Sequence, residues 1–407
     1  GVTGNTTANA ALPKAGGAMT GAITTNSTFD GVDIATRDGV LTTTTNTANA
    51  ALPKAGGTMT GAIVLGTNTV GGLQITTTAT NNIGLGANAV DSITTGDHNT
   101  GLGVNALTDN TEGEKNTAVG MDALANNTTA DNNTALGQSA LYTNTTGANN
   151  TAVGMYSLLS NTTGHGNVAV GKDSMAANTE GFQNVALGED SLQANTTGDY
   201  NVALGKSALF ANTTADYNVA VGRNSLATNT TGHSNTAVGY IALTANTTAN
   251  HNAGFGYWAL KSVTTGHSNS AMGSNAGRTI TTGIQNTAGG AYALSNATTP
   301  SNNTAFGYSA LAETTTGDSN VAVGWNVLNA NTTGYYNNGI GRSALTANTT
   351  GAQNIAIGAD ALMANTTANF NTSVGNYSLT ANTTGASNTA VGYQSLKANT
   401  TAANNTA

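Results

Sequence analysis

Residues 116–132 read Asn-Thr-Ala-Val-Gly-Met-Asp-Ala-Leu-Ala-Asn-Asn-Thr-Thr-Ala-Asp-Asn, and the phrase begins again, with few changes, at Asn133. It restarts every 17 residues from Asn82 to Asn388, which gives 19 complete copies, and a twentieth begins at Asn405. No copy contains an insertion or a deletion. A fixed period this short is typical of a solenoid, in which each repeat forms one rung stacked on the previous one. We therefore predict an all-β fold over residues 82–407, a parallel β-solenoid or β-roll.

The positions of a rung, counted from its first Asn, differ in what they tolerate. Position 5 is Gly in all 19 copies, position 3 is always Ala, Gly or Ser, position 4 is usually Val, Leu or Ile, and position 9 is Leu in 16 copies. Every Asp, Glu, Lys and Arg of the array falls at position 6, 7, 10, 11, 14, 16 or 17. Because an unpaired buried charge is costly, we predict that the charge-free positions, including the aliphatic positions 4 and 9, are packed.

The same pattern predicts the path of the chain within a rung. We expect one short strand at positions 1–4, bent at the Gly of position 5, a second strand at positions 8–10, and a turn at Asn-Thr-Thr-Gly. The small residue at position 3 indicates a close approach, either by the opposite wall of the rung or by a neighbouring chain. The invariant Asn of position 1 predicts a ladder of amides along the stack. Rungs about 4.8 Å apart would give a rod of roughly 90 Å. The ladder positions include Asn116, Asn133 and Asn150. The bend positions include Gly120, Gly137 and Gly154, and the core positions include Leu124, Leu141 and Leu158.

Composition excludes several classes of protein. The chain has 407 residues, of which only 7% are charged, and its net charge is −8. This charge argues against binding to a nucleic-acid backbone, which needs clustered Lys and Arg. The absence of cysteine excludes disulfides and cysteine-based metal sites. No apolar run reaches the roughly 18 residues of a membrane span, so we expect no membrane insertion.

Residues 1–81 carry a different repeat. Asn-Ala-Ala-Leu-Pro-Lys-Ala-Gly-Gly-Ala-Met-Thr-Gly-Ala-Ile ends at Ile23, and a second copy with Thr58 in place of Ala ends at Ile63, 40 residues later. This phrase resembles a repeat of bacteriophage tail fibre proteins. The resemblance implies an extended, trimeric virion fibre and transfers no catalytic residue. A Gly/Pro-rich linker is the alternative interpretation of this region.

The narrow rung also bears on assembly. Val at position 4, Leu at position 9 and two small residues make a poor core for a single chain, and the first strand is apolar or Thr on both faces, which favours cover by a partner. We therefore expect a homotrimer, with a single-chain three-sided helix as the alternative. The string Asn-x-Ala-Val-Gly-x-x-Ala-Leu resembles the head repeats of trimeric autotransporter adhesins. That resemblance implies a left-handed parallel β-roll with three chains to a head, although the present rung is about three residues longer.

No constellation for catalysis or for a cofactor is apparent, and we expect no enzyme activity, no cofactor and no metal site. All five histidines fall at rung positions 16 or 17 in the turn, where a trimer axis could gather copies into a metal site; we favour solvated turn residues instead. These are His98, His165, His233, His251 and His267.

The block 252–319 is the most irregular part of the array. Position 12, usually Asn, becomes Val263, Ile280, Ala297 and Thr314, and Gly277 replaces the core Leu, with Arg278 after it. Aromatic residues gather nearby at positions expected to face outward, and exposed aromatics can stack on sugars or on partner proteins. Drift in a tolerant shaft is the alternative to a contact site. The candidate contact residues are Tyr240, Tyr257, Trp258, Tyr292, Tyr308 and Trp325.

The sequence thus predicts a structural fibre or adhesin segment, like a phage tail fibre, that acts as a rigid spacer and attaches to a host surface through a glycan or protein. We expect it in a virion tail fibre, or outside the cell or on its surface. A bacterial trimeric surface adhesin or extracellular filament is the alternative, and an ice-binding solenoid is a third, less favoured one. Because the chain begins and ends within repeat sequence, we expect it to belong to a longer protein.

Overall fold

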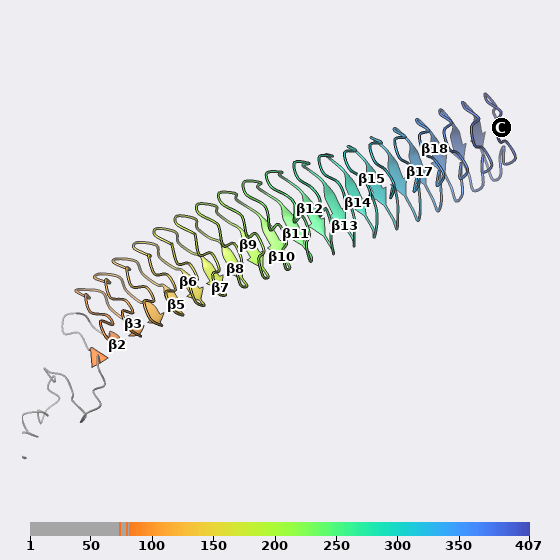
Figure 1. Ribbon diagram of the computed structural model, residues 1–407. Helices are drawn as coiled ribbons and strands as arrows, with labels where there is room; N and C mark the ends of the chain where they lie inside the picture. The colour runs from red at the N-terminus through yellow and green to blue at the C-terminus, as the bar shows by residue number, and fades with distance from the viewer. Residues whose placement is uncertain (1–72, 75–78, 80) are drawn as a thin grey trace, which may run out of the picture. The chain divides into compact units, whose positions relative to one another are not determined.

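The computed structural model describes residues 73–74, 79 and 81–407. In this part of the chain the regular elements are all strands (Figure 1). The predicted tail-fibre-like region, with Pro13 and Pro53, lies almost wholly outside the described residues. The strands are β1 (Leu73–Gln74), β2 (Ile83–Leu85), β3 (Thr100–Leu102), β4 (Thr117–Val119), β5 (Thr134–Leu136), β6 (Thr151–Val153), β7 (Val168–Val170), β8 (Val185–Leu187), β9 (Val202–Leu204), β10 (Val219–Val221), β11 (Thr236–Val238), β12 (Ala253–Phe255), β13 (Ser270–Met272), β14 (Thr287–Gly289), β15 (Thr304–Phe306), β16 (Val321–Val323), β17 (Asn338–Ile340), β18 (Ile355–Ile357), β19 (Thr372–Val374) and β20 (Thr389–Val391).

The strands β2 to β20 form one parallel sheet in which each strand pairs with the next along the chain. In β4 and β5, for example, Thr117 lies opposite Thr134 and Ala118 opposite Ala135, a shift of one full repeat. β1 pairs with β2 in the antiparallel sense. Figure 1 shows the strands following one another along one side of the stack. The predicted parallel β-solenoid with a 17-residue rung is therefore confirmed.

Each of the strands β2 to β20 covers rung positions 2–4 and stops at the Gly of position 5. These glycines have φ between 117° and 140°, a region that disfavours residues with a side chain. The next rung also approaches closely, since a Cβ atom on Gly120 would lie 2.5 Å from the carbonyl oxygen of Gly137. Gly137 (φ 139°) and Gly154 (φ 128°) repeat this arrangement. Conformation and contact both require glycine here.

The predicted second strand at positions 8–10 is wrong, because positions 6–11 form two consecutive turns. In one rung the Ala123 N–H donates to the Gly120 carbonyl (3.4 Å), and the Asn127 N–H donates to the Leu124 carbonyl (3.2 Å). Asp122 (φ 58°) and Leu124 (φ 49°) adopt left-handed conformations, which break a strand. The turns still bond along the stack, since the Leu124 N–H donates to Ala140 of the next rung at 3.0 Å.

The inside of the rung is filled by positions 3, 8 and 9. Leu124, Leu141 and Leu158 are fully buried, as is Ala118 of β4. Where position 3 is Gly101, a Cβ atom would lie 3.1 Å from the carbonyl oxygen of Ala106, at position 8 of the same rung. Of the two explanations for the small residue at position 3, the opposite wall of the rung is the correct one.

The prediction that position 4 is packed inside the rung is also wrong. Side chains alternate along a strand, so the inward position 3 places positions 2 and 4 on the opposite face of the sheet. Val119 is half-buried, Leu136 is 47% exposed and Phe255 is 42% exposed. We call the side chains at positions 2 and 4 of β2 to β20 the outer sheet face. It is a continuous surface of mainly Thr, Val, Leu and Ile.

The Asn of position 1 closes each rung and ties it to the next. Asn133 Nδ2 donates to the carbonyl of Gly147 in its own rung (2.9 Å), and Asn133 Oδ1 accepts the backbone N–H of Asn150 (2.9 Å). Asn133 N–H in turn donates to Asn116 Oδ1 at 2.9 Å. The three Asn side chains are fully buried. These bonds satisfy backbone groups that a 17-residue loop would otherwise leave unpaired inside the stack.

A second amide ladder runs through position 12. Asn144 Nδ2 donates to Asn127 Oδ1 of the previous rung and to the Gly147 carbonyl, both at 2.9 Å. This ladder is interrupted for four rungs, where Val263, Ile280, Ala297 and Thr314 are all buried. The hydroxyls of position 13 continue across the interruption, each donating to the carbonyl of position 13 one rung on.

Candidate functional site

The six aromatic side chains singled out in the sequence lie at rung positions 6 and 7, the first two residues after the bend. The glycine bend turns the chain away from the sheet, and the left-handed residue at position 7 completes the corner. All but Trp258 are exposed, and Trp258 is half-buried. The corner therefore presents ring faces outward, but it does not bring all six together.

The first group consists of Tyr240, Tyr257 and Trp258, which follow β11 and β12. Tyr240 stacks on Tyr257 with 5.6 Å between ring centroids, and Tyr257 stacks on Trp258 at 4.7 Å. Lys261 Nζ lies 4.2 Å from the centroid of the Trp258 ring, a cation–π contact. Trp258 Nε1 is buried without a hydrogen-bond partner. The rings of this group thus contact mainly one another and Lys261.

The second group consists of Tyr292 and Tyr308, which follow β14 and β15 and meet edge to face at 5.8 Å. Trp325, one rung beyond Tyr308 at the same position, is 53% exposed. Ser274 and Asn275 hold the corner in the rung between the two groups. The six candidate residues therefore fall into two separate groups, and whether either group makes a contact stays a prediction.

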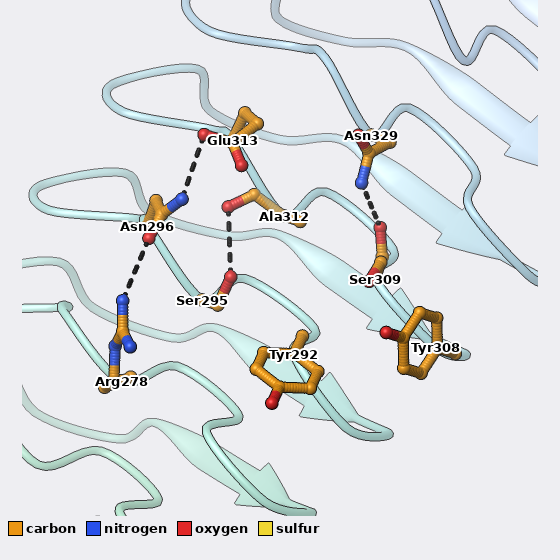
Figure 2. A pocket seen from close by; sticks show the side chains of 9 residues that line it. All are labelled: Arg278, Tyr292, Ser295, Asn296, Tyr308, Ser309, Ala312, Glu313 and Asn329. Carbon is orange, nitrogen blue, oxygen red and sulfur yellow. Dashed lines mark hydrogen bonds between the residues drawn. The ribbon is translucent and has the colours of Figure 1, made fainter.

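The two tyrosines of the second group border a groove with a volume of about 280 Å³. Figure 2 shows the tyrosines and Ser309 just after the strands, and the remaining lining side chains farther along each rung. Arg278 Nη2 donates to Asn296 Oδ1 at 3.3 Å, and Asn296 Nδ2 donates to Glu313 Oε2 at 2.9 Å. The groove, which we call the tyrosine groove, is lined by Arg278, Tyr292, Ser295, Asn296, Tyr308, Ser309, Ala312, Glu313 and Asn329.

The sequence reasoning missed the polar half of this groove. Arg278 was noticed only as an irregularity beside Gly277, and Asn296 and Glu313 were not singled out. A signal was available at position 10, where Ser295 and Ala312 are two small residues in successive rungs, a pair that occurs nowhere else in the array. Small side chains in successive rungs leave a hollow on the surface.

A further aromatic stack at positions 16 and 17 was also missed. His165 stacks on Phe182 (4.9 Å), Phe182 meets Tyr200 edge to face (5.2 Å), and Tyr200 stacks on Tyr217 (5.2 Å). Beside it, burial raises the pKa of the Asp199 carboxyl, and the charge of Asp216 adds to this shift.

Several carboxylates of position 16 have a structural role. Asp131 Oδ1 accepts the backbone N–H of Glu114 in the previous rung at 2.7 Å, and Asp216 Oδ1 accepts the N–H of Asp199 at 2.8 Å. Asn250 bonds the N–H of His233 in the same way. The acidic turn residues thus help to join successive rungs.

The five histidines are all exposed. His233 and His251 meet edge to face at 5.2 Å, and His98 Nε2 lies 3.2 Å from Asn81 Nδ2. Within the described residues, no group of three or more His, Cys, Asp or Glu side chains is placed to hold a metal ion. A search of the same residues for a helix able to cross a membrane found none.

The described chain is a tandem-repeat parallel β-solenoid, an architecture consistent with a structural, fibre-like protein. Comparison of the sequence with models of known protein families and with curated proteins gave no match.

Proposed function

We propose that this chain is the rigid part of an extracellular or virion fibre that assembles as a homotrimer through the outer sheet face and carries an attachment site. The observation that supports it most directly is the composition of that face. Over 19 rungs, positions 2 and 4 hold no charged residue, and large side chains such as Leu136 and Phe255 stand 47% and 42% exposed. Contiguous apolar surface of this extent is typical of an interaction surface.

The regularity of the face supports further copies of this chain as the occupant. Its side chains stand in two rows whose spacing is the rung spacing, about 4.8 Å for parallel strands. A partner with the same spacing can fill every gap in those rows, whereas an unrelated surface matches only a few. Closed rings are the usual outcome when identical chains associate, and the resemblance to trimeric adhesin heads and tail fibres favours three chains.

The role that fits this assembly is mechanical. Two amide ladders and the threonine row join the rungs, and the core of each rung rests on its neighbours. Such a stack holds a distal surface at a fixed distance, and the proposal assigns it no catalysis. A bacterial surface adhesin built from the same rung remains the alternative: a signal peptide and a membrane anchor in the full protein would favour it, and a baseplate-attachment domain would favour the virion fibre.

The ice-binding alternative receives less support. The position 13 hydroxyls donate to backbone carbonyls, as Thr145 does to Thr162 (3.1 Å). The outer sheet face mixes Thr with bulky side chains such as Phe255 and Met272, which makes it uneven. Thermal hysteresis of the purified protein would be required to revive this alternative.

Multi-angle light scattering of the full chain tests the assembly. We expect about three times the chain mass of 40.2 kDa. Val221→Glu places a charge in the middle of the outer sheet face and should shift the particle toward the single-chain mass. Thr197→Glu is the matched control, because Thr197 is an exposed position 14 residue and other rungs carry Glu at that position. A single-chain mass for the unmodified protein, or a trimer indifferent to Val221→Glu, would contradict the proposal.

A further inference from the structure

The tyrosine groove has a floor that runs along the stack. Arg278, Ser295, Ala312 and Asn329 occupy position 10 in four successive rungs. Ser295 and Ala312, both nearly buried, form the hollow, and the longer Arg278 and Asn329 close its two ends. The groove thus follows from two short side chains between two long ones.

The two sides of the groove differ in chemistry. Tyr292 and Tyr308, which are 41% and 50% exposed, form one side and offer aromatic surface. Asn296 and Glu313, one position beyond the floor in successive rungs, form the other (Figure 2). An aromatic wall facing a polar wall suits a molecule that has an apolar face and a rim of hydroxyl groups.

The polar side of the groove has hydrogen-bond donors and acceptors that its internal bonds do not use. The bonds Arg278–Asn296 and Asn296–Glu313 use one guanidinium N–H and one carboxylate oxygen. A guanidinium has five N–H donors and a carboxylate accepts about four hydrogen bonds. The groove can therefore offer several donors and acceptors side by side, and the opposite charges of Arg278 and Glu313 leave it with no net charge.

We propose that the tyrosine groove binds a neutral saccharide unit. The C–H face of a pyranose ring lies on Tyr308 or Tyr292, and its hydroxyls bond Arg278, Asn296 and Glu313. A nucleic acid would need an excess of positive charge, which the groove lacks, and a protein hot spot would more often show a deep apolar pocket. The inference rests on the attachment part of the proposed function and names the chemical class of its receptor.

The groove is compatible with the proposed assembly, because none of its residues belongs to a strand. Its floor and polar wall lie on the returning segment of the rung, whereas the proposed contact between chains is the outer sheet face. It coincides with the part of the array in which the position 12 ladder is interrupted. Two departures from the repeat thus fall in the same few rungs.

Saturation-transfer NMR and titration calorimetry on the full chain test the inference. The probes are the methyl glycosides of glucose, galactose, mannose and N-acetylglucosamine, with a neutral trisaccharide of each sugar. We expect at least one trisaccharide to bind in the millimolar range or tighter, with the strongest saturation transfer to the ring C–H protons. Tyr308→Ala should weaken this binding at least tenfold, and Tyr308→Phe should retain it, because the ring face makes the contact. Glu313→Ala should also weaken it.

Tyr257→Ala is the matched control, since Tyr257 also occupies position 6 and is exposed but lies outside the groove. The inference is overturned if no probe binds at millimolar concentration, if Tyr257→Ala causes the same loss as Tyr308→Ala, or if sialyllactose binds more tightly than every neutral sugar. Light scattering on the same samples separates the two proposals. A single chain that binds sugar contradicts the assembly alone, and a trimer that binds none contradicts the groove alone.

Discussion

Ile280 reaches into the space where the core leucine of a rung would begin, because Gly277 stands at that leucine's position. A Cβ atom on Gly277 would lie 3.2 Å from Ile280 Cδ1 and 2.8 Å from Leu260 Cδ2. Both neighbouring side chains are 1% exposed. A rung that lacks the core Leu at position 9 therefore keeps a filled interior, because position 12 supplies an aliphatic group in place of an amide.

This exchange of volume predicts strong coupling between the two positions. Gly277→Leu alone overpacks the rung and should lower the free energy of unfolding by about 1–3 kcal/mol. Ile280→Asn alone leaves a cavity and should cost about 2–5 kcal/mol. The double variant recreates the usual rung and should cost at least about 1 kcal/mol less than the sum of the two changes. Gly277 has φ 58°, close to the values of the core leucines, so its backbone accepts Leu. Urea denaturation of the four proteins measures the coupling, and simple additivity would refute it.

The amide ladder of position 1 should contribute measurably at each rung. Asn201→Ala removes the bond from Asn201 Nδ2 to the Ala215 carbonyl (2.8 Å) and leaves the buried N–H of Asn218 without its acceptor. An unpaired buried donor costs about 1–3 kcal/mol, and we expect a loss of that size in urea denaturation. The control Thr197→Ala, at an exposed position of the preceding rung, should stay within about 0.5 kcal/mol of the unmodified protein. Equal stabilities of the two variants would exclude a ladder contribution.

The glycine of position 5 should be far more sensitive than other glycines with positive φ. A Cβ atom at Gly154 (φ 128°) would lie 2.6 Å from the carbonyl oxygen of Gly171, and that backbone is fixed by the stack. Gly154→Ala should therefore destabilise the protein by at least about 2 kcal/mol.

Gly166 provides the comparison. It has φ 67°, but the nearest atom to its Cβ position is 3.5 Å away, and other rungs place Asn149 or Gln183 at the same position. Gly166→Ala should change the free energy of unfolding by less than about 1 kcal/mol. Thermal unfolding of both variants would decide the matter, and similar midpoints would show that close approach at position 5 is unimportant.

Asp199 should make stability depend on pH in an unusual direction. Its pKa is raised from the ordinary value of 3.8, mainly by burial and further by the charge of Asp216. The folded protein therefore favours the protonated carboxyl, so this residue contributes stability below pH 3.8 that is lost as the pH rises through the folded-state pKa. Asp199→Asn removes the charge and keeps an oxygen to accept the N–H of Phe182.

We accordingly expect Asp199→Asn to be the more stable protein at pH 7 and its advantage to vanish near pH 3. Urea midpoints of both proteins at the two pH values provide the measurement. Asp131→Asn is the control for the amide substitution itself, since Asp131 also stands at position 16 and accepts a backbone N–H of the previous rung. An Asp199→Asn advantage that grows on acidification would contradict the assignment.

The repeat period and the glycine bend could be predicted from the sequence because the Asn of position 1 and the Gly of position 5 are the same in all 19 copies. The inward direction of positions 3 and 9 could be predicted because no copy carries a charged residue at either position. The direction of position 4 was mistaken because hydrophobicity was taken as burial within the chain, whereas alternation places Val119 opposite to Ala118. The turns at positions 6–11 could not be foreseen, since Leu124 in a left-handed conformation contradicts the intrinsic preference of leucine.

The candidate site was foreseen only in its aromatic half. Tyr292 and Tyr308 were identifiable because aromatic residues are rare in this chain, which is 5% aromatic. Arg278, Asn296 and Glu313 come from different rungs, and their proximity depends on the register of the stack and on side-chain length. Those quantities become visible only once the rungs are placed on one another.

The bonding of each rung to the next has a consequence for how such a protein can change its length. Every carbonyl and amide that Asn133 engages recurs one repeat later, so duplication or loss of a whole 17-residue unit restores all contacts at the junction. An insertion of any other size would put the two halves out of phase. The length of the solenoid can therefore change in steps of one rung. Recombination between near-identical repeats is enough for such a step, and no repeat needs to change its sequence.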